Sequence, residues 1–103
     1  MKLRGKQKRY LRAQAHHLRP VFSVGKNGLT KSWLAQLGGA LDNHELLKIN
    51  LQQNTDVTTA EVKEFIEQKT DIQVVQTIGH VLVLFKVSAD PDKREISENV
   101  QKI

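Results

Sequence analysis

Hydrophobic residues recur at helical spacing in three segments of this chain. In the first segment, about residues 5–18, one stripe is formed by Leu3, Tyr10, Leu11, Ala15 and Leu18. Pro20 ends this segment, because proline disfavours helical geometry in the residue before it. The second helix is expected after Thr30, a residue type suited to the N-cap, and the glycine pair Gly38-Gly39 within it predicts close packing there.

The third helix has the clearest predicted start. Thr58 and Glu61 have the spacing of a capping box, and Val57 with Val62 forms a candidate hydrophobic staple. The side chains expected to face inward from this helix are Val62, Phe65 and Ile66. A helix beginning just after Thr58 is therefore predicted.

Four short runs, residues 21–24, 47–51, 73–78 and 81–87, have the composition or alternation of strands. Gly79-His80 separates the last two runs, and glycine at the first central position suits a type II′ hairpin. The predicted fold class is α/β, a single domain of order α-β-α-β-α-β-β with three helices on a four-stranded mixed sheet, whose first two strands are parallel. The domain is expected to span residues 1–87, and residues 88–103 are expected to form a polar, loosely held C-terminal tail with at most a helical turn.

Composition narrows the class of protein. Without cysteine, the chain has no disulfide framework, no Cys-based zinc site and no thiolate nucleophile. No apolar stretch approaches the roughly 18 residues of a membrane span, and no apolar block follows the basic N-terminus as in a secretory signal. A cytoplasmic, monomeric protein without cofactor, metal or membrane contact is expected.

Positive charge is concentrated in the first 41 residues, which contain nine Lys or Arg and no Asp or Glu. The remaining residues contain all eleven acidic side chains, several of them on the third predicted helix. This asymmetry indicates a polyanionic partner, although a solvated basic helix opposite a solvated acidic one is the alternative.

The loop Gly25-Lys26-Asn27-Gly28 lies between a predicted strand and a predicted helix. Two glycines allow the backbone to approach a ligand closely, and the N–H groups at the start of the next helix favour a phosphate. A lone G-x-x-G pattern is weak evidence for ligand binding, since many loops use two glycines for turn geometry. Its acid-free surroundings, with Arg19 and Lys31 on either side, favour the phosphate-binding interpretation.

The same regions resemble a known family. Residues 5–12, 15–18 and 24–30, followed by residues 44–48 and 75–80, are similar to the bacterial single-domain members of the CRM family, the YhbY-like proteins. The resemblance implies a fold similar to the C-terminal domain of the third translation initiation factor. It also implies RNA binding through the glycine loop and association with precursors of the large ribosomal subunit.

We therefore expect a protein that binds RNA, with ribosomal RNA as the partner, and that has neither enzymatic activity nor a small-molecule substrate. The predicted RNA-binding residues are Arg4, Lys6, Lys8, Arg9, Arg12, His16, Arg19, Gly25, Lys26, Asn27, Gly28 and Lys31. This hypothesis requires the first helix and the glycine loop to come together in one positive surface. A DNA-binding module, a small enzyme that uses the glycine loop for a mononucleotide, and a protein-interaction adaptor stay open as alternatives.

Three further histidines and the tryptophan have structural explanations. His17, His44 and His80 are expected to be packing or turn residues, and with His16 they lack metal-ligand spacing. Trp33 could serve as a platform for base stacking, but its place on the apolar stripe of the second helix favours the core.

Overall fold

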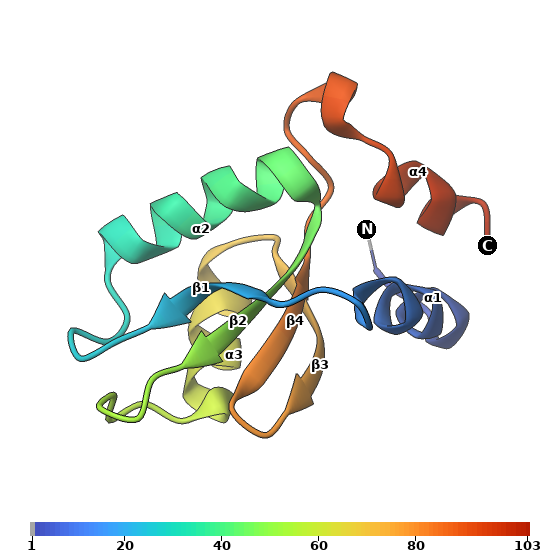
Figure 1. The fold of residues 1–103 in the computed structure, drawn as a ribbon. Coiled ribbons are helices and arrows are strands. Elements are labelled where there is room, and N and C mark those ends of the chain that lie inside the picture. The colour runs from blue at the N-terminus through green and yellow to red at the C-terminus, as the bar shows by residue number, and fades with distance from the viewer. Residues whose placement is uncertain (1) are drawn as a thin grey trace.

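One mixed sheet of order β1-β2-β4-β3 forms the centre of the protein, in a computed structural model that describes residues 2–103 (Figure 1). β1 (Pro20–Val24) runs parallel to β2 (Leu46–Leu51), and β4 (Val81–Phe85) is antiparallel to β2 and to β3 (Gln73–Ile78). The predicted α/β class and the mixed sheet with parallel first strands are confirmed.

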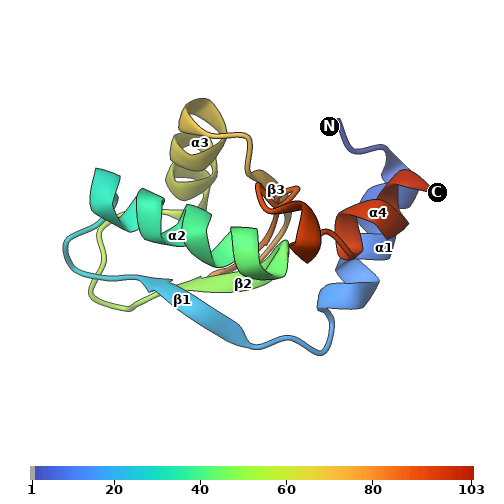
Figure 2. The same cartoon turned by 90° about the horizontal axis from the view of Figure 1, so that it is seen from above.

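Two helices, α2 (Lys31–His44) and α3 (Thr59–Lys69), cover one face of the sheet (Figure 2). Alternation along β2 turns Leu47, Ile49 and Leu51 toward these helices, as predicted. The helices contribute the fully buried side chains Leu37, Leu41, Val62 and Ile66. This layer is the larger of the two hydrophobic cores.

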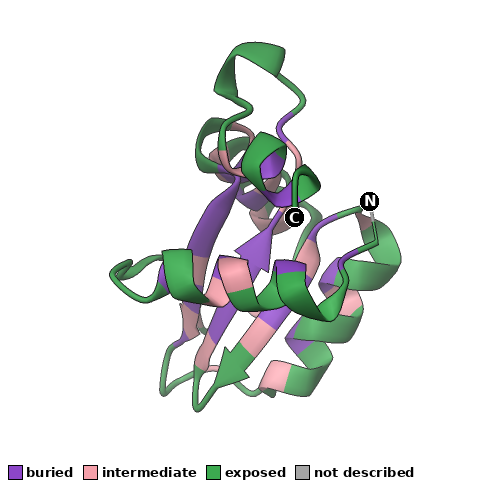
Figure 3. Cartoon of the chain, turned by 90° about the vertical axis from the view of Figure 1, so that its right-hand side faces the viewer, coloured by how far each residue is buried: buried purple, intermediate pink, exposed green. Residues whose placement is uncertain are grey.

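The opposite face is covered at one end only, by α1 (Gly5–Ala15) and a short helix α4 (Ile96–Gln101). Leu11 and Ala15 of α1 pack there against Leu46, with further strand residues from β3 and β4. The helices are exposed along their outer sides, whereas many of the buried residues lie in the strands (Figure 3). The second core therefore leaves the other half of this sheet face without a covering helix.

Helix starts agree with the sequence prediction, but the end of α1 does not. Thr30 Oγ1 accepts a hydrogen bond from Trp33 N at 3.0 Å, and Thr58 with Glu61 forms the expected capping box. α1 was expected to reach residue 18 and ends at Ala15. Leu18 is consequently 38% exposed instead of joining the apolar stripe.

Of the two glycine predictions, one is confirmed and the other is wrong. Gly79 has a positive φ of 56° at the hairpin between β3 and β4, as the first central position of a type II′ turn requires. Gly38 and Gly39 were expected to permit close packing. A Cβ atom on either glycine would meet no other atom within 4 Å, so no neighbouring element packs closely enough to require glycine there.

The expectation of a loosely held C-terminal tail is wrong. After β4 the chain forms a short 3₁₀ helix (Pro91–Lys93) and then α4, which together exceed the single helical turn expected here. Val100 is fully buried in the core beneath α1, and Gln7 Nε2 donates to the Val100 carbonyl at 3.1 Å. Only a few residues of this polar segment are buried, so its composition gave no indication of these contacts.

Candidate nucleic-acid interface

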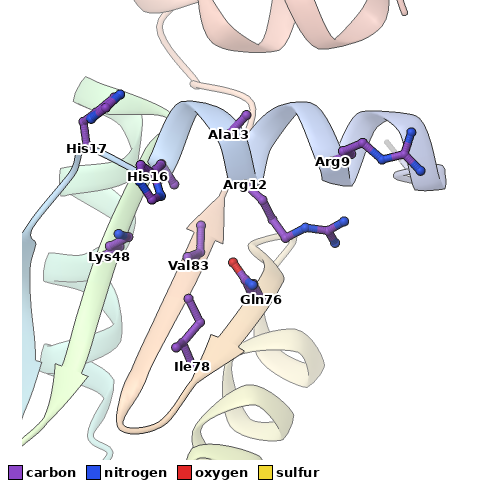
Figure 4. Close-up of a pocket in the computed structure, with 10 residues that line it drawn as sticks. Arg9, Arg12, Ala13, His16, His17, Lys48, Gln76, Ile78 and Val83 are labelled. Carbon is purple, nitrogen blue, oxygen red and sulfur yellow. The ribbon is translucent and has the colours of Figure 1, made fainter.

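A groove of about 500 Å³ lies between α1 and the uncovered half of the sheet (Figure 4). We call it the α1 groove, and its lining includes Arg9, Arg12, His16, His17, Lys48, Gln76, Ile78 and Val83. Helix α1 forms its upper side, and the strands β2, β3 and β4 form its floor.

The positions of the basic side chains follow from the packing of α1. Leu11 and Ala15, four residues apart, turn one stripe of the helix into the core. Arg12 and His16 follow each of them by one residue, so they lie at the edge of that stripe and border the groove. Lys48 joins them from β2, because it lies on the same sheet face as Leu46.

The cations of the groove are not neutralised by the protein itself. Among residues 2–103 the recorded ion pair joins Lys86 and Asp42, away from the groove. Arg9, Arg12 and Lys48 thus have no carboxylate within ion-pair distance in the described chain. Unpaired guanidinium and ammonium groups around a hollow favour an anionic ligand such as a phosphate backbone.

An irregularity in β3 brings Gln76 into the groove. The register between β3 and β4 shifts between Val74 and Gln76. Val74 belongs to the core under α2 and α3, while Val75 is buried under α1. Since a bulge places two successive residues toward the same face, Gln76 follows Val75 onto the side of α1.

Both glycines of the loop have a structural reason in this fold. Gly28 has a φ of 68°, and its N–H donates to the Gly25 carbonyl at 3.0 Å. A Cβ on Gly25 would lie 3.1 Å from Gln52 Oε1, so that glycine permits a close contact with the loop after β2. Lys26 and Asn27, at the tip, are exposed.

The expectation that α1 and the glycine loop come together is wrong. The loop follows the far end of β1, and α1 precedes its near end, so the two lie at opposite ends of the molecule (Figures 1 and 2). Val24, the last residue before the loop, is paired with Leu51, three residues beyond Lys48. Three strand residues correspond to about 10 Å. The positive charges therefore form two separate groups along one sheet, not one cluster.

Comparison with known proteins places the chain in a family. The CRS1 / YhbY (CRM) domain matches residues 3–86. The protein belongs to the CRM family. Its relatives include the Probable RNA-binding protein YqeI of Bacillus subtilis, which is 42% identical over 94 residues, 91% of this chain and 98% of the relative. A Haemophilus influenzae protein named RNA-binding protein is 42% identical over 85 residues, 82% of this chain and 86% of its own.

A solved structure of the same architecture supports the assignment to the CRM family. The solution structure of the protein SAV1595 from Staphylococcus aureus has a TM-score of 0.72 and 36% sequence identity to this chain. The match covers 91% of the present chain and 98% of the other. The CRM match ends at residue 86, before the 3₁₀ helix and α4.

Other predicted site residues of this CRM domain are distributed more widely. The Arg4 guanidinium donates to the Ile103 carbonyl, which ties it to the C-terminus. Lys6 and Lys8 are exposed on α1 but do not line the groove, and Lys31 is exposed at the first turn of α2. Arg19 borders a different, mainly apolar hollow with Leu18, Val21 and Leu46.

Sequence reasoning missed three polar residues of the α1 groove. Lys48 and Gln76 were assigned only to strands, and His17 was expected to be a packing or turn residue but is exposed and lines the groove. The alternation that buries Leu46 could have placed Lys48 on the same face, whereas the β3 bulge that positions Gln76 has no signal in the sequence.

The core prediction for the tryptophan is confirmed. Trp33 packs against the larger core, and its Nε1 donates to the Ser23 carbonyl at 2.9 Å. Within residues 2–103, no group of three or more His, Asp or Glu side chains could hold a metal ion. In the same described part of the CRM chain, no helix is both long and apolar enough to cross a membrane.

Proposed function

We propose that this protein binds RNA, with the α1 groove and the glycine loop as two contact points on one strand or structured element. The unneutralised Arg9, Arg12 and Lys48 around the groove are the observation that carries the proposal. Proteins that bind nucleic acid gain most of their affinity from such cations, which displace counterions from the phosphate backbone. The RNA-binding names of the Bacillus subtilis and Haemophilus influenzae relatives support the choice of RNA.

The finer assignment is an assembly factor of the large ribosomal subunit, acting in the cytoplasm on ribosomal RNA. Its support is the likeness of the glycine loop and the first helix to the YhbY-like proteins. In this proposal the monomer holds RNA without altering a covalent bond. Residues 1–87 make the RNA contacts, and residues 88–103 pack against α1 on the side away from the groove.

The direct test is equilibrium binding of fluorescent ribosomal RNA fragments to charge-reversed variants. Arg9→Glu combined with Arg12→Glu, and separately Lys26→Glu, should each weaken binding while the unfolding midpoint stays unchanged, since all three residues lie at the surface or at its edge. Lys93→Glu is the matched control, because Lys93 is exposed on the 3₁₀ helix, outside the groove and the loop. Normal binding by the first two variants would refute the proposed site.

Two further measurements separate the alternatives. Unlabelled duplex DNA should compete less well than RNA, since the 2′-hydroxyls and A-form shape distinguish RNA. The ribosomal assignment predicts sedimentation of the protein with large-subunit precursor particles at low salt and its release at high salt. Equal competition by DNA would favour a DNA-binding module, and absence from those particles would remove the ribosomal role alone.

A further inference from the structure

Six side chains on the α1 side of the sheet form two cross-strand rows. Strand pairing sets Lys48 opposite Val83, which is opposite Gln76, and the next row consists of Asn50, Val81 and Ile78. Neighbouring strands lie about 4.8 Å apart and alternate residues about 6.7 Å apart. We call this array the sheet platform. Its area, about 10 by 7 Å, is comparable to that of one nucleobase.

The accessible apolar side chain of the sheet platform is that of Ile78, at one corner of the array. Ile78 is 51% exposed, although large aliphatic side chains of a sheet are usually covered. Val81 beside it is half-buried, and Val83 is fully buried beneath α1. Ile78 thus offers an apolar contact beside the unpaired cations of the groove.

Amide side chains stand at diagonal corners of the sheet platform. Asn50 and Gln76 are both half-buried, and within residues 2–103 neither side-chain amide is hydrogen-bonded to the rest of the chain. An amide offers a donor and an acceptor together, the combination that pairs with the edge of a base. Figure 4 shows Gln76 and Ile78 side by side on the groove floor, below Arg12.

We propose that the sheet platform receives an unpaired RNA base, which lies on Ile78 and Val81 and is read at its edge by Asn50 and Gln76. This inference rests on the proposed RNA binding and names the form of RNA that the groove takes. Arg12 and Lys48 at the rim bind the adjoining phosphates. A continuous duplex does not fit this role, because its stacked, paired bases cannot lie flat against a sheet, whereas unpaired bases can be splayed outward.

The test compares single-stranded RNA with an oligonucleotide of the same length and backbone that lacks bases at consecutive central positions. Wild-type protein should bind the base-lacking RNA more weakly. Asn50→Ala and Gln76→Ala should each weaken binding to intact RNA by about 5- to 150-fold, the range of one lost amide–base contact. The same substitutions should leave binding to the base-lacking RNA unchanged.

Gln36→Ala provides the matched control, because Gln36 is an exposed amide on α2, which covers the opposite face of the sheet. Thermal unfolding of each variant checks that the fold is intact. Equal binding of intact and base-lacking RNA, or normal binding by both amide variants, overturns the sheet platform but leaves the proposed function standing. Failure of the wild-type protein to bind any RNA overturns both.

Discussion

The carboxylate of Glu45, one residue beyond α2, accepts a hydrogen bond from the backbone N–H of Ser97 at 3.1 Å, across 52 residues of sequence. The same carboxylate accepts from Ser88 N at 2.8 Å and from Glu95 N at 2.9 Å. Glu45 is 1% exposed and has a left-handed backbone, with φ 62°. Glycine is the usual residue there, so the carboxylate contacts offset the backbone cost of about 1–2 kcal/mol.

Replacing Glu45 by alanine should loosen the C-terminal segment and destabilise the whole protein. Three buried or half-buried N–H groups lose their acceptor, at roughly 1–3 kcal/mol each, so the free energy of unfolding should fall by at least about 3 kcal/mol. Urea denaturation measures the loss of stability. The backbone amides of Ser88 and Ser97 should be the first to show faster hydrogen exchange. Glu98→Ala, at an exposed site on α4, should have little effect; an equally small effect of Glu45→Ala would contradict this role.

Stability should decrease at low pH because of the same carboxylate. Burial alone would raise the pKa of Glu45, but hydrogen bonds from Ser97, Ser88 and Glu95 outweigh it and hold the pKa below its ordinary 4.5. A lowered folded-state pKa stabilises the protein fully above the unfolded-state value, and this contribution is lost as pH falls through the folded-state value. Unfolding free energies measured below pH 4.5 should therefore decrease less steeply for Glu45→Gln than for wild type. Parallel pH curves for the two proteins would argue against the linkage.

Alanine should stabilise α2 at either glycine of the pair. Gly38 and Gly39 lie inside the helix and a Cβ would meet no atom within 4 Å, so the substitution adds helix propensity without a clash. Each of Gly38→Ala and Gly39→Ala should raise the free energy of unfolding by about 0.5–1 kcal/mol. Chemical denaturation tests both, and a loss of stability would reveal a contact that the static structure does not contain.

The opposite result is expected at the glycine loop. Gly28 has a φ of 68°, which an L-residue adopts at a cost of roughly 1–2 kcal/mol. Gly28→Ala should therefore lower the free energy of unfolding by about that amount, although a Cβ there would meet only the Val57 side chain at 4.0 Å. Gly28→Asn is the informative partner, because asparagine tolerates this conformation better, and it should recover part of the loss. Equal stabilities of the alanine and asparagine variants would not fit a backbone cause.

RNA affinity should fall with salt in proportion to the phosphates contacted. For a single strand the logarithm of the binding constant changes by about −0.7 per phosphate contact for each tenfold increase in salt. Lys48→Glu should remove at least one contact and so make the slope shallower, with Lys93→Glu again as the control. Titrations at several potassium chloride concentrations give the slopes, and a wild-type affinity independent of salt would exclude backbone binding.

Local signals in the sequence predicted the elements of the fold. Thr58 and Glu61 act within one helical turn, and the alternation of Leu47, Ile49 and Leu51 depends only on which face of a strand is buried. The end of α1 was overestimated, since residues after Ala15 are also compatible with a helix and only the path into β1 ends it.

The candidate site was predictable in its chemistry more than in its arrangement. Arg9, Arg12 and His16 were recognised from charge and spacing, but their partners Lys48 and Gln76 come from strands far along the chain. The separation of α1 from the glycine loop follows from β1, which the sequence already predicted at residues 21–24; the expectation of one joint surface overlooked that a strand keeps its two ends apart. Residues 88–103 are fixed by hydrogen bonds to Glu45. Local periodicity does not encode contacts between segments so far apart in the sequence.

The indole of Trp33 has a consequence for association between chains. β1 is an edge strand, and successive carbonyls of a strand point to opposite sides; Val24 O bonds to Gln52 N after β2, so Ser23 O points outward. Trp33 Nε1 already occupies that outward acceptor. An incoming strand would have to displace the indole to extend the sheet at β1, so this side chain hinders strand addition at that edge.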